Sequence, residues 1–165
     1  MKKLLLILLC LPFIGFGQVT LLPSIGLIDE PNDADSVCDI IPRNQGNLWN
    51  TLSPGDTMAN FKLWDVNGDS IILSDVISSG KNVLMISGSY TCPIFRNHMS
   101  DLNAVAAQFG NDIECFVVYT VEAHPTGTPM PYSGNINPSN PPYFQPNTYG
   151  ERKLIIQDLL NGVNG

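Results

Sequence analysis

The chain has 165 residues, with eight basic and fifteen acidic side chains, and its formal net charge is −7. This length suits one domain with a single core, and the acidic balance argues against nucleic acid as a partner. Glycine and proline, at 14 and 13 residues, are used well above average, which predicts a long irregular segment.

Residues 1–17 have the pattern of an export signal. Two lysines precede an apolar run, Leu4–Leu11, and small residues follow it. Pro12 interrupts the run, which is shorter than the ~20 residues that a membrane-spanning helix needs, so a membrane anchor is disfavoured. We expect cleavage before Gln18, no stable membrane span afterwards, and export to the periplasm of a Gram-negative bacterium or to the outside of the cell.

Removal of this segment leaves three cysteines, Cys38, Cys92 and Cys115. An odd count leaves at least one thiol unpaired or paired between two chains, so a homodimer is among the expected assemblies. A free thiol in an oxidising compartment needs burial or a function, because an exposed thiolate is easily oxidised.

Residues 18–52 show no sustained hydrophobic period and predict an extended leader that packs across the domain. Residues 53–165 are expected to form the domain. An alternating run that begins at Asn60 is followed by Asn67-Gly68-Asp69 and then by the apolar residues 70–73. Asn-Gly between two runs with high β-propensity predicts a hairpin.

The next segments predict a parallel strand–helix–strand unit. Val83–Ser87 and Ile113–Val121 are apolar runs of strand length. Between them, apolar residues recur every three or four positions and predict one amphipathic helix that starts near Pro93 and ends at Gly110. They are Phe95, Met99, Leu102, Val105, Ala106 and Phe109. We expect a right-handed connection between the strands.

Residues 123–150 contain no Asp, Glu, Lys or Arg and are rich in proline. Their aromatic side chains indicate a loop that lies on the body of the protein, where these rings either line a pocket or anchor the loop. A short helix is expected from Glu151.

Cys92 stands where the first core strand ends and the helix begins. In an open α/β sheet, reactive groups collect at this edge, and the N–H groups of a helix start favour a thiolate. A buried, inert cysteine is the alternative. His98, further along the helix, is expected to pack or to face solvent.

Several motifs resemble the thioredoxin-like redoxin domain over roughly residues 53–121. These are Gly55-Asp56 through Leu63, Asn67 through Asp75, and the strand that leads into Thr91-Cys92-Pro93. Two tighter matches, residues 88–95 and 119–125, are similar to the active-site and Glu-Ala-His-Pro segments of the iodothyronine deiodinase family, in particular its bacterial, cysteine-containing relatives.

The resemblance implies an α/β, thioredoxin-like fold with a mixed sheet and an N-terminal hairpin, in which Cys92 takes the place of the family's selenocysteine. Glu122 and His124 match the acidic residue and the histidine at the family's active site. Parallel pairing of the two core strands brings both residues to the edge that carries Cys92, where they can transfer protons. The candidate supporting residues are Thr91, Pro93, Phe95 and Arg96.

The resemblance also implies an exported, thiol-based oxidoreductase that acts on a small molecule or a disulfide. We expect no cofactor and an external thiol as electron donor, with Cys38 as the candidate resolving cysteine and Cys115 as a core residue. The C-terminal ββα portion of the fold is not found before Gly165, so we expect a truncated domain that aggregates readily.

The chain differs from the motifs of other thioredoxin-like proteins, and these differences reduce the number of activities that it is expected to have. Phe95 replaces the second cysteine of a thioredoxin Cys-x-x-Cys motif, and Arg96 stands where copper-delivery relatives have a second cysteine, so no metal site is expected. Met85 and Ser89 stand where peroxiredoxins have proline and threonine. A thiol peroxidase and a non-catalytic binding module of thioredoxin-like fold stay open as alternatives.

Overall fold

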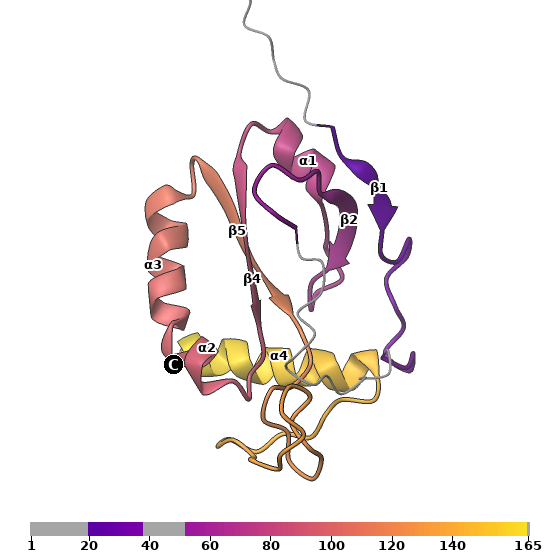
Figure 1. The fold of residues 1–165 in the computed structure, drawn as a ribbon, viewed down its shortest axis with the longest axis vertical. Helices are drawn as coiled ribbons and strands as arrows, with labels where there is room; N and C mark the ends of the chain where they lie inside the picture. Colours follow the sequence, from indigo (N-terminus) through magenta and orange to yellow (C-terminus); the bar gives the residue numbers. More distant parts are fainter. Residues whose placement is uncertain (1–19, 38–51, 165) are drawn as a thin grey trace, which may run out of the picture.

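The computed structural model describes residues 20–37 and 52–164, which form a mixed α/β arrangement (Figure 1). The strands are β1 (Leu22–Ile25), β2 (Ala59–Trp64), β3 (Ser70–Ile72), β4 (Asn82–Gly88) and β5 (Ile113–Tyr119). The helices are α1 (Leu73–Ser78), α2 (Pro93–Asn97), α3 (Met99–Phe109) and α4 (Tyr149–Asn164). The predicted export signal and Cys38 lie outside the described residues.

The predicted hairpin is confirmed by the antiparallel pairing of β2 and β3, with Leu63 opposite Ile71. Its turn is stabilised by the carboxylate of Asp65, which accepts the backbone N–H groups of Asn67 and Asp69 at 2.8 and 2.9 Å. Burial acts to raise the pKa of Asp65, but these hydrogen bonds outweigh it and lower the pKa. Gly68, at φ +86°, supplies the positive φ that the turn requires.

The described part of the leader contributes a strand that the sequence did not predict. β1 pairs parallel to β2, with Leu22 opposite Ala59. Further along, the ammonium group of Lys153 in α4 lies 3.0 Å from the carboxylate of Asp33 and 3.7 Å from that of Glu30. The leader therefore joins the three-stranded sheet to the start of α4.

Helix α1 begins where the sequence predicted the end of a strand, at Leu73. The side chain of its N-cap residue, Ile72, forms no capping hydrogen bond. Instead, the side-chain oxygen of Asn60, on β2, accepts the backbone N–H of Ser74 at 3.0 Å. This cap comes from the tertiary structure, so no local pattern predicts it.

The predicted parallel pair is confirmed. β4 and β5 run in register from Asn82 opposite Ile113 to Gly88 opposite Tyr119, two residues short of the expected end of the second strand. The expected mixed sheet is divided, however: β1, β2 and β3 form one hydrogen-bonded sheet, and β4 and β5 form another. The edge-to-face contact of Phe61 with Phe116, at 6.2 Å between ring centroids, packs the two sheets together.

The prediction of one continuous helix after Cys92 is wrong. His98, at φ −102° and ψ 3°, separates the five-residue helix α2 from α3. Its backbone N–H donates to Phe95, three residues back, so the chain tightens and changes direction. The imidazole of His98 faces solvent and pairs with the carboxylate of Asp101 at 3.0 Å. The dipole that faces Cys92 is therefore that of a single short helix.

Helix α4 lies across the carboxyl ends of β4 and β5, beside the loop of residues 120–148 (Figure 1). It starts two residues before the expected position, and Thr148 and Glu151 form a capping box: the hydroxyl accepts the N–H of Glu151, and the carboxylate accepts that of Thr148. Ile155 and Leu159 are its buried apolar residues. Among the helices in the described residues, none has the length and apolar character needed to cross a bilayer.

Candidate functional site

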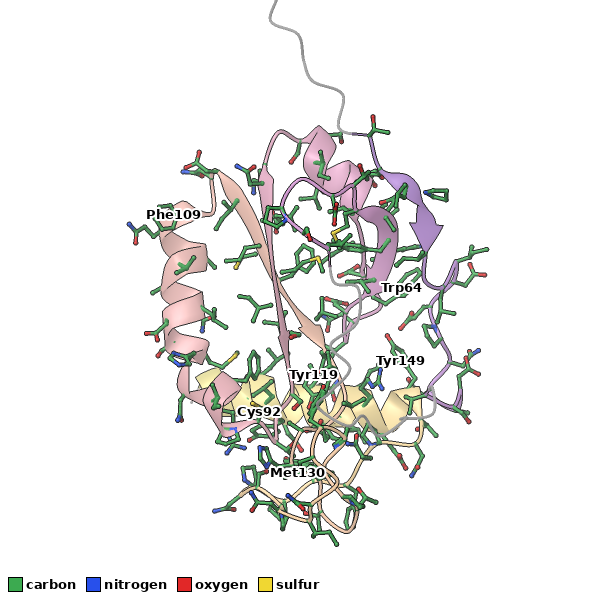
Figure 2. The ribbon with its side chains drawn as sticks, in the orientation of Figure 1. Trp64, Cys92, Phe109, Tyr119, Met130 and Tyr149 are labelled. Carbon is green, nitrogen blue, oxygen red and sulfur yellow. The ribbon has the colours of Figure 1, made fainter. Side chains whose placement is uncertain are left out.

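Cys92 is the N-cap residue of α2, directly after β4 and its short exit turn. Figure 2 shows Cys92 and Tyr119 toward the same end of the two core strands. The sulfur accepts the backbone N–H of Phe95 at 3.5 Å, and Pro93 occupies the first turn, as predicted. The thiol is partly exposed and forms no disulfide within the described part of the chain. Cys92 is therefore only partly covered by the rest of the protein.

Phe95 holds α2 against the end of β4. Its ring is 7% exposed and lies so close to Gly88 that a Cβ atom there would be 2.4 Å from two ring carbons. Only glycine permits this approach. The contact fixes the distance between the strand and the helix that flank Cys92.

Thr91, the residue before Cys92, is held by Glu122. Both residues are completely buried. Oε2 of Glu122 accepts the backbone N–H of Thr91 at 3.0 Å and its hydroxyl at 2.7 Å. A buried carboxylate requires such donors to replace lost water. Glu122 therefore positions the turn that carries Cys92, and its predicted part in proton transfer stays a prediction.

Tyr119, for which the sequence predicted no role, completes this network. Its hydroxyl donates to Oε1 of Glu122 and accepts the backbone N–H of Tyr90 at 3.0 Å. Burial, and then the hydrogen bond to Glu122 and its charge, raise the pKa of Tyr119 above the ordinary value. The available signal was the strand register, which places Tyr119 opposite Gly88 at the edge of the sheet where Cys92 lies.

The backbone of His124 reaches the same turn. Its N–H donates to the hydroxyl of Thr91 at 3.0 Å, so this hydroxyl links Glu122 and His124. Nδ1 of the imidazole lies 3.2 Å from the carbonyl oxygen of Asn137. A carbonyl can only accept, so this hydrogen bond places the proton on Nδ1 and leaves Nε2 as the acceptor of the neutral ring. The segments of His124 and Cys92 are thus hydrogen-bonded through Thr91, and the predicted part of the imidazole in proton transfer stays a prediction.

Two further hydrogen-bonded contacts hold residues 122–124 in place. Ser89, which is 1% exposed, accepts the backbone N–H of Ala123 on its hydroxyl at 3.1 Å. The side-chain amide of Gln145 pairs with both backbone groups of Glu122, at 3.0 and 2.6 Å. Nothing in the sequence indicated Gln145, because it lies in the uncharged loop without a motif.

Arg96 ties α2 to that loop. Its guanidinium donates to the carbonyl oxygen of Tyr90 at 2.6 Å and to that of Asn140 at 2.9 Å. The ring of Tyr90 stacks on that of Tyr143, at 5.0 Å between centroids, and the hydroxyl of Tyr143 donates to Asp158 in α4 at 2.9 Å. Asn140 and Tyr143 therefore anchor the loop, the first to α2 and the second to α4.

Of the two other cysteines, the structure describes Cys115, which does not lie at the site. Cys115 is half-buried within β5, opposite Leu84, four residues before the carboxyl end of the strand. Cys38 lies outside the described residues. Within residues 20–37 and 52–164, no three His, Cys, Asp or Glu side chains lie close enough together to hold a metal ion.

Comparison with models of known protein families found no match, and a search of curated proteins found no similar sequence.

Proposed function

We propose that this chain is an exported, thiol-dependent oxidoreductase of thioredoxin-like fold, with a site of the iodothyronine deiodinase type and Cys92 as its nucleophile. The observation that carries the proposal is the triple use of Thr91. Its N–H and hydroxyl donate to Glu122, and its hydroxyl accepts from His124, so the nucleophile and the histidine segment are held together. Such preorganisation is what nucleophilic catalysis requires.

For a disulfide substrate, Nε2 of His124 takes the proton of the Cys92 thiol, and the resulting thiolate attacks one sulfur atom. A mixed disulfide forms, the substrate S–S bond breaks, and the other sulfur leaves as a thiolate that takes this proton back from His124. An external thiol then attacks the Cys92 sulfur of the mixed disulfide, which releases the second half of the substrate as a thiol and leaves the donor bound to Cys92. A second donor thiol attacks the donor sulfur of this disulfide and restores Cys92, so two donor thiols form one disulfide and reduce one substrate disulfide.

Three features of the site support this role. The sulfur is partly exposed, it accepts the N–H of Phe95, and Nε2 of His124 is left free of the proton that Nδ1 shares with Asn137. Glu122 and Thr91 act through the position of Cys92 and are positioning residues. Pro93 and Phe95 hold the helix start at which the sulfur lies.

The test is the rate of iodoacetamide alkylation of Cys92 at neutral pH, in a chain that carries Cys38→Ser and Cys115→Ser. We expect Cys92 to be alkylated faster than a cysteine in an unstructured peptide under the same conditions. The same chain should reduce a small disulfide with an external thiol, and Cys92→Ser should abolish this. Peptide-like alkylation together with no activity would overturn the proposal.

The alternatives are a thiol peroxidase and a non-catalytic binding module. The shortness of α2 favours the binding module, because a five-residue helix directs a weaker field at the sulfur than the longer helix expected from the sequence. Treatment with hydrogen peroxide distinguishes the peroxidase from the other candidates. Rapid formation of a sulfenic acid at Cys92, which the external thiol then reduces, would assign peroxidase activity.

A further inference from the structure

A pocket that Cys92 does not line lies between α2 and the last turns of α4. Its volume is about 200 Å³, and it is lined by Tyr90, Arg96, Met99, Pro141, Leu159 and Gly162. Figure 1 shows α2 beside the C-terminal part of α4. We propose that this pocket binds a small aliphatic carboxylate, with Arg96 holding the carboxylate group. This inference does not depend on the proposed redox activity.

The charge of Arg96 is the first argument. Its guanidinium bonds two backbone carbonyls, which satisfy donors without neutralising the positive charge. Within the described ranges, no carboxylate lies within 4.0 Å of it, as is also the case for Lys62 and Arg152, whereas Lys81 and Lys153 are both paired with acidic side chains. Of these three unpaired cations, Arg96 is the one that lines this pocket, where it is half-buried. It attracts an anionic ligand.

The fixed geometry of Arg96 is the second argument. A guanidinium has five N–H donors in one plane, and the carbonyls of Tyr90 and Asn140 each take one, which leaves three. Two carbonyl contacts and the ring of Tyr90, 5.7 Å from the guanidinium carbon, hold the group in place. Little side-chain entropy is then lost on binding, and the planar donors match a carboxylate.

The walls and the size of the pocket define the rest of the ligand. Met99, Pro141 and Leu159 are apolar and suit an aliphatic chain. A volume of 200 Å³ corresponds to about seven water molecules at ~30 Å³ each, so a ligand of about seven non-hydrogen atoms fills it. The hydroxyl of Tyr90 is directed at Gly162, where an added Cβ would be 3.4 Å away, and can donate a further hydrogen bond.

The experiment compares pentanoate with its neutral analogue pentanamide, titrated into the full chain and followed by backbone amide chemical shifts. We expect saturable shifts at Tyr90, Arg96 and Gly162 with pentanoate, and at least tenfold weaker binding of pentanamide. Equal affinity for the two compounds, or no saturable shift with pentanoate, would overturn the proposal. Inorganic phosphate is a third titrant, and binding as tight as that of pentanoate would also overturn the carboxylate assignment.

Gly162→Leu tests the location without touching Arg96. Its Cβ fits at ordinary contact distance from Tyr90, leucine is a better helix former than glycine, and the remaining side-chain atoms occupy the pocket. Asn161→Leu, at the exposed neighbouring position of α4, is the matched control. We expect Gly162→Leu to weaken pentanoate binding at least tenfold and Asn161→Leu to leave it unchanged. Wild-type binding by Gly162→Leu would place the ligand elsewhere and refute the site.

Discussion

The carboxylate of Glu122 accepts both the backbone N–H and the hydroxyl of Thr91, a residue 31 positions earlier in the chain. Both side chains are fully buried, and the hydrogen bonds join the end of β4 to the segment after β5. Because Thr91 precedes Cys92, the position of the sulfur depends on a carboxylate that does not itself bond to it.

The first prediction concerns Glu122→Gln. An amide has only one oxygen, so either the hydroxyl of Tyr119 or the pair of donors on Thr91 loses its acceptor. We expect the free energy of unfolding to fall by roughly 2–4 kcal/mol, measured by urea denaturation. A loss below about 1 kcal/mol would show that the network is not what stabilises the turn. Glu151→Gln, at an exposed carboxylate that caps α4, is the control for generic charge loss.

The second prediction concerns the hydroxyl of Thr91. Thr91→Val keeps the shape but removes the donor to Glu122 and the acceptor for the N–H of His124. We expect a loss of about 2–3 kcal/mol and slower alkylation of Cys92, because the cysteine turn and the histidine segment are released from each other. Thr91→Ser keeps the hydroxyl and should retain most of the alkylation rate. If both variants react at the same rate, the hydroxyl has no positioning role.

The third prediction concerns the contact between β4 and α2. Gly88→Ala places a methyl group 2.4 Å from ring carbons of Phe95, so the ring or the backbone must move. We expect a loss of roughly 1–3 kcal/mol in thermal or urea unfolding. Phe95→Leu in the same chain should recover part of it, since the smaller side chain frees the space. If the losses of unfolding free energy in the two single variants simply add in the double variant, the two residues do not compete for the same space.

The fourth prediction concerns alkaline pH. Burial, and then hydrogen bonding to a carboxylate, raise the pKa of Tyr119 above 10 and that of Tyr143 to about 12, whereas in the unfolded chain both ionise near 10.0. The stabilisation is therefore complete below pH 10 and is lost as the pH rises from 10 towards 12. Tyr119 contributes at most about 1.4 kcal/mol per pH unit to the decline, and Tyr143 contributes less, because water screens its exposed hydrogen bond to Asp158.

Unfolding free energies measured between pH 8 and 11.5 check this prediction. Tyr119→Phe and Tyr143→Phe should each show a shallower decline above pH 10 than the wild-type chain, and Tyr132→Phe, at an exposed tyrosine, should not. Parallel curves for all four proteins would contradict the shifted ionisation.

Local patterns were sufficient for the hairpin and for the parallel pair of core strands. Asn67-Gly68 specified a turn because glycine reaches positive φ there, and the apolar runs specified strands buried together. Parallel register then brought the residues after both strands to one edge, which is why the segments that carry Cys92 and His124 could be placed side by side from the sequence.

Contacts between distant segments decided the other features. The apolar spacing after Cys92 is continuous, so it predicted one helix, but the chain tightens at His98 and the short α2 packs Phe95 against Gly88. The sequence indicated Arg96 as a candidate supporting residue of the site, but not that the carbonyl oxygen of Asn140, in the loop, would hold its guanidinium group. Likewise, α1 is capped by Asn60 from a neighbouring strand.

The amino-acid sequence by itself determined which segments become the core strands and which cysteine stands at their edge, because hydrophobic period and turn chemistry act over a few residues. Only the tertiary structure decided that Glu122 would be buried on Thr91 and Tyr119, that His124 would direct Nδ1 at Asn137, and that Arg96 would line a pocket with α4. A buried polar group must find its partners wherever the fold places them, and those partners are distant in the chain.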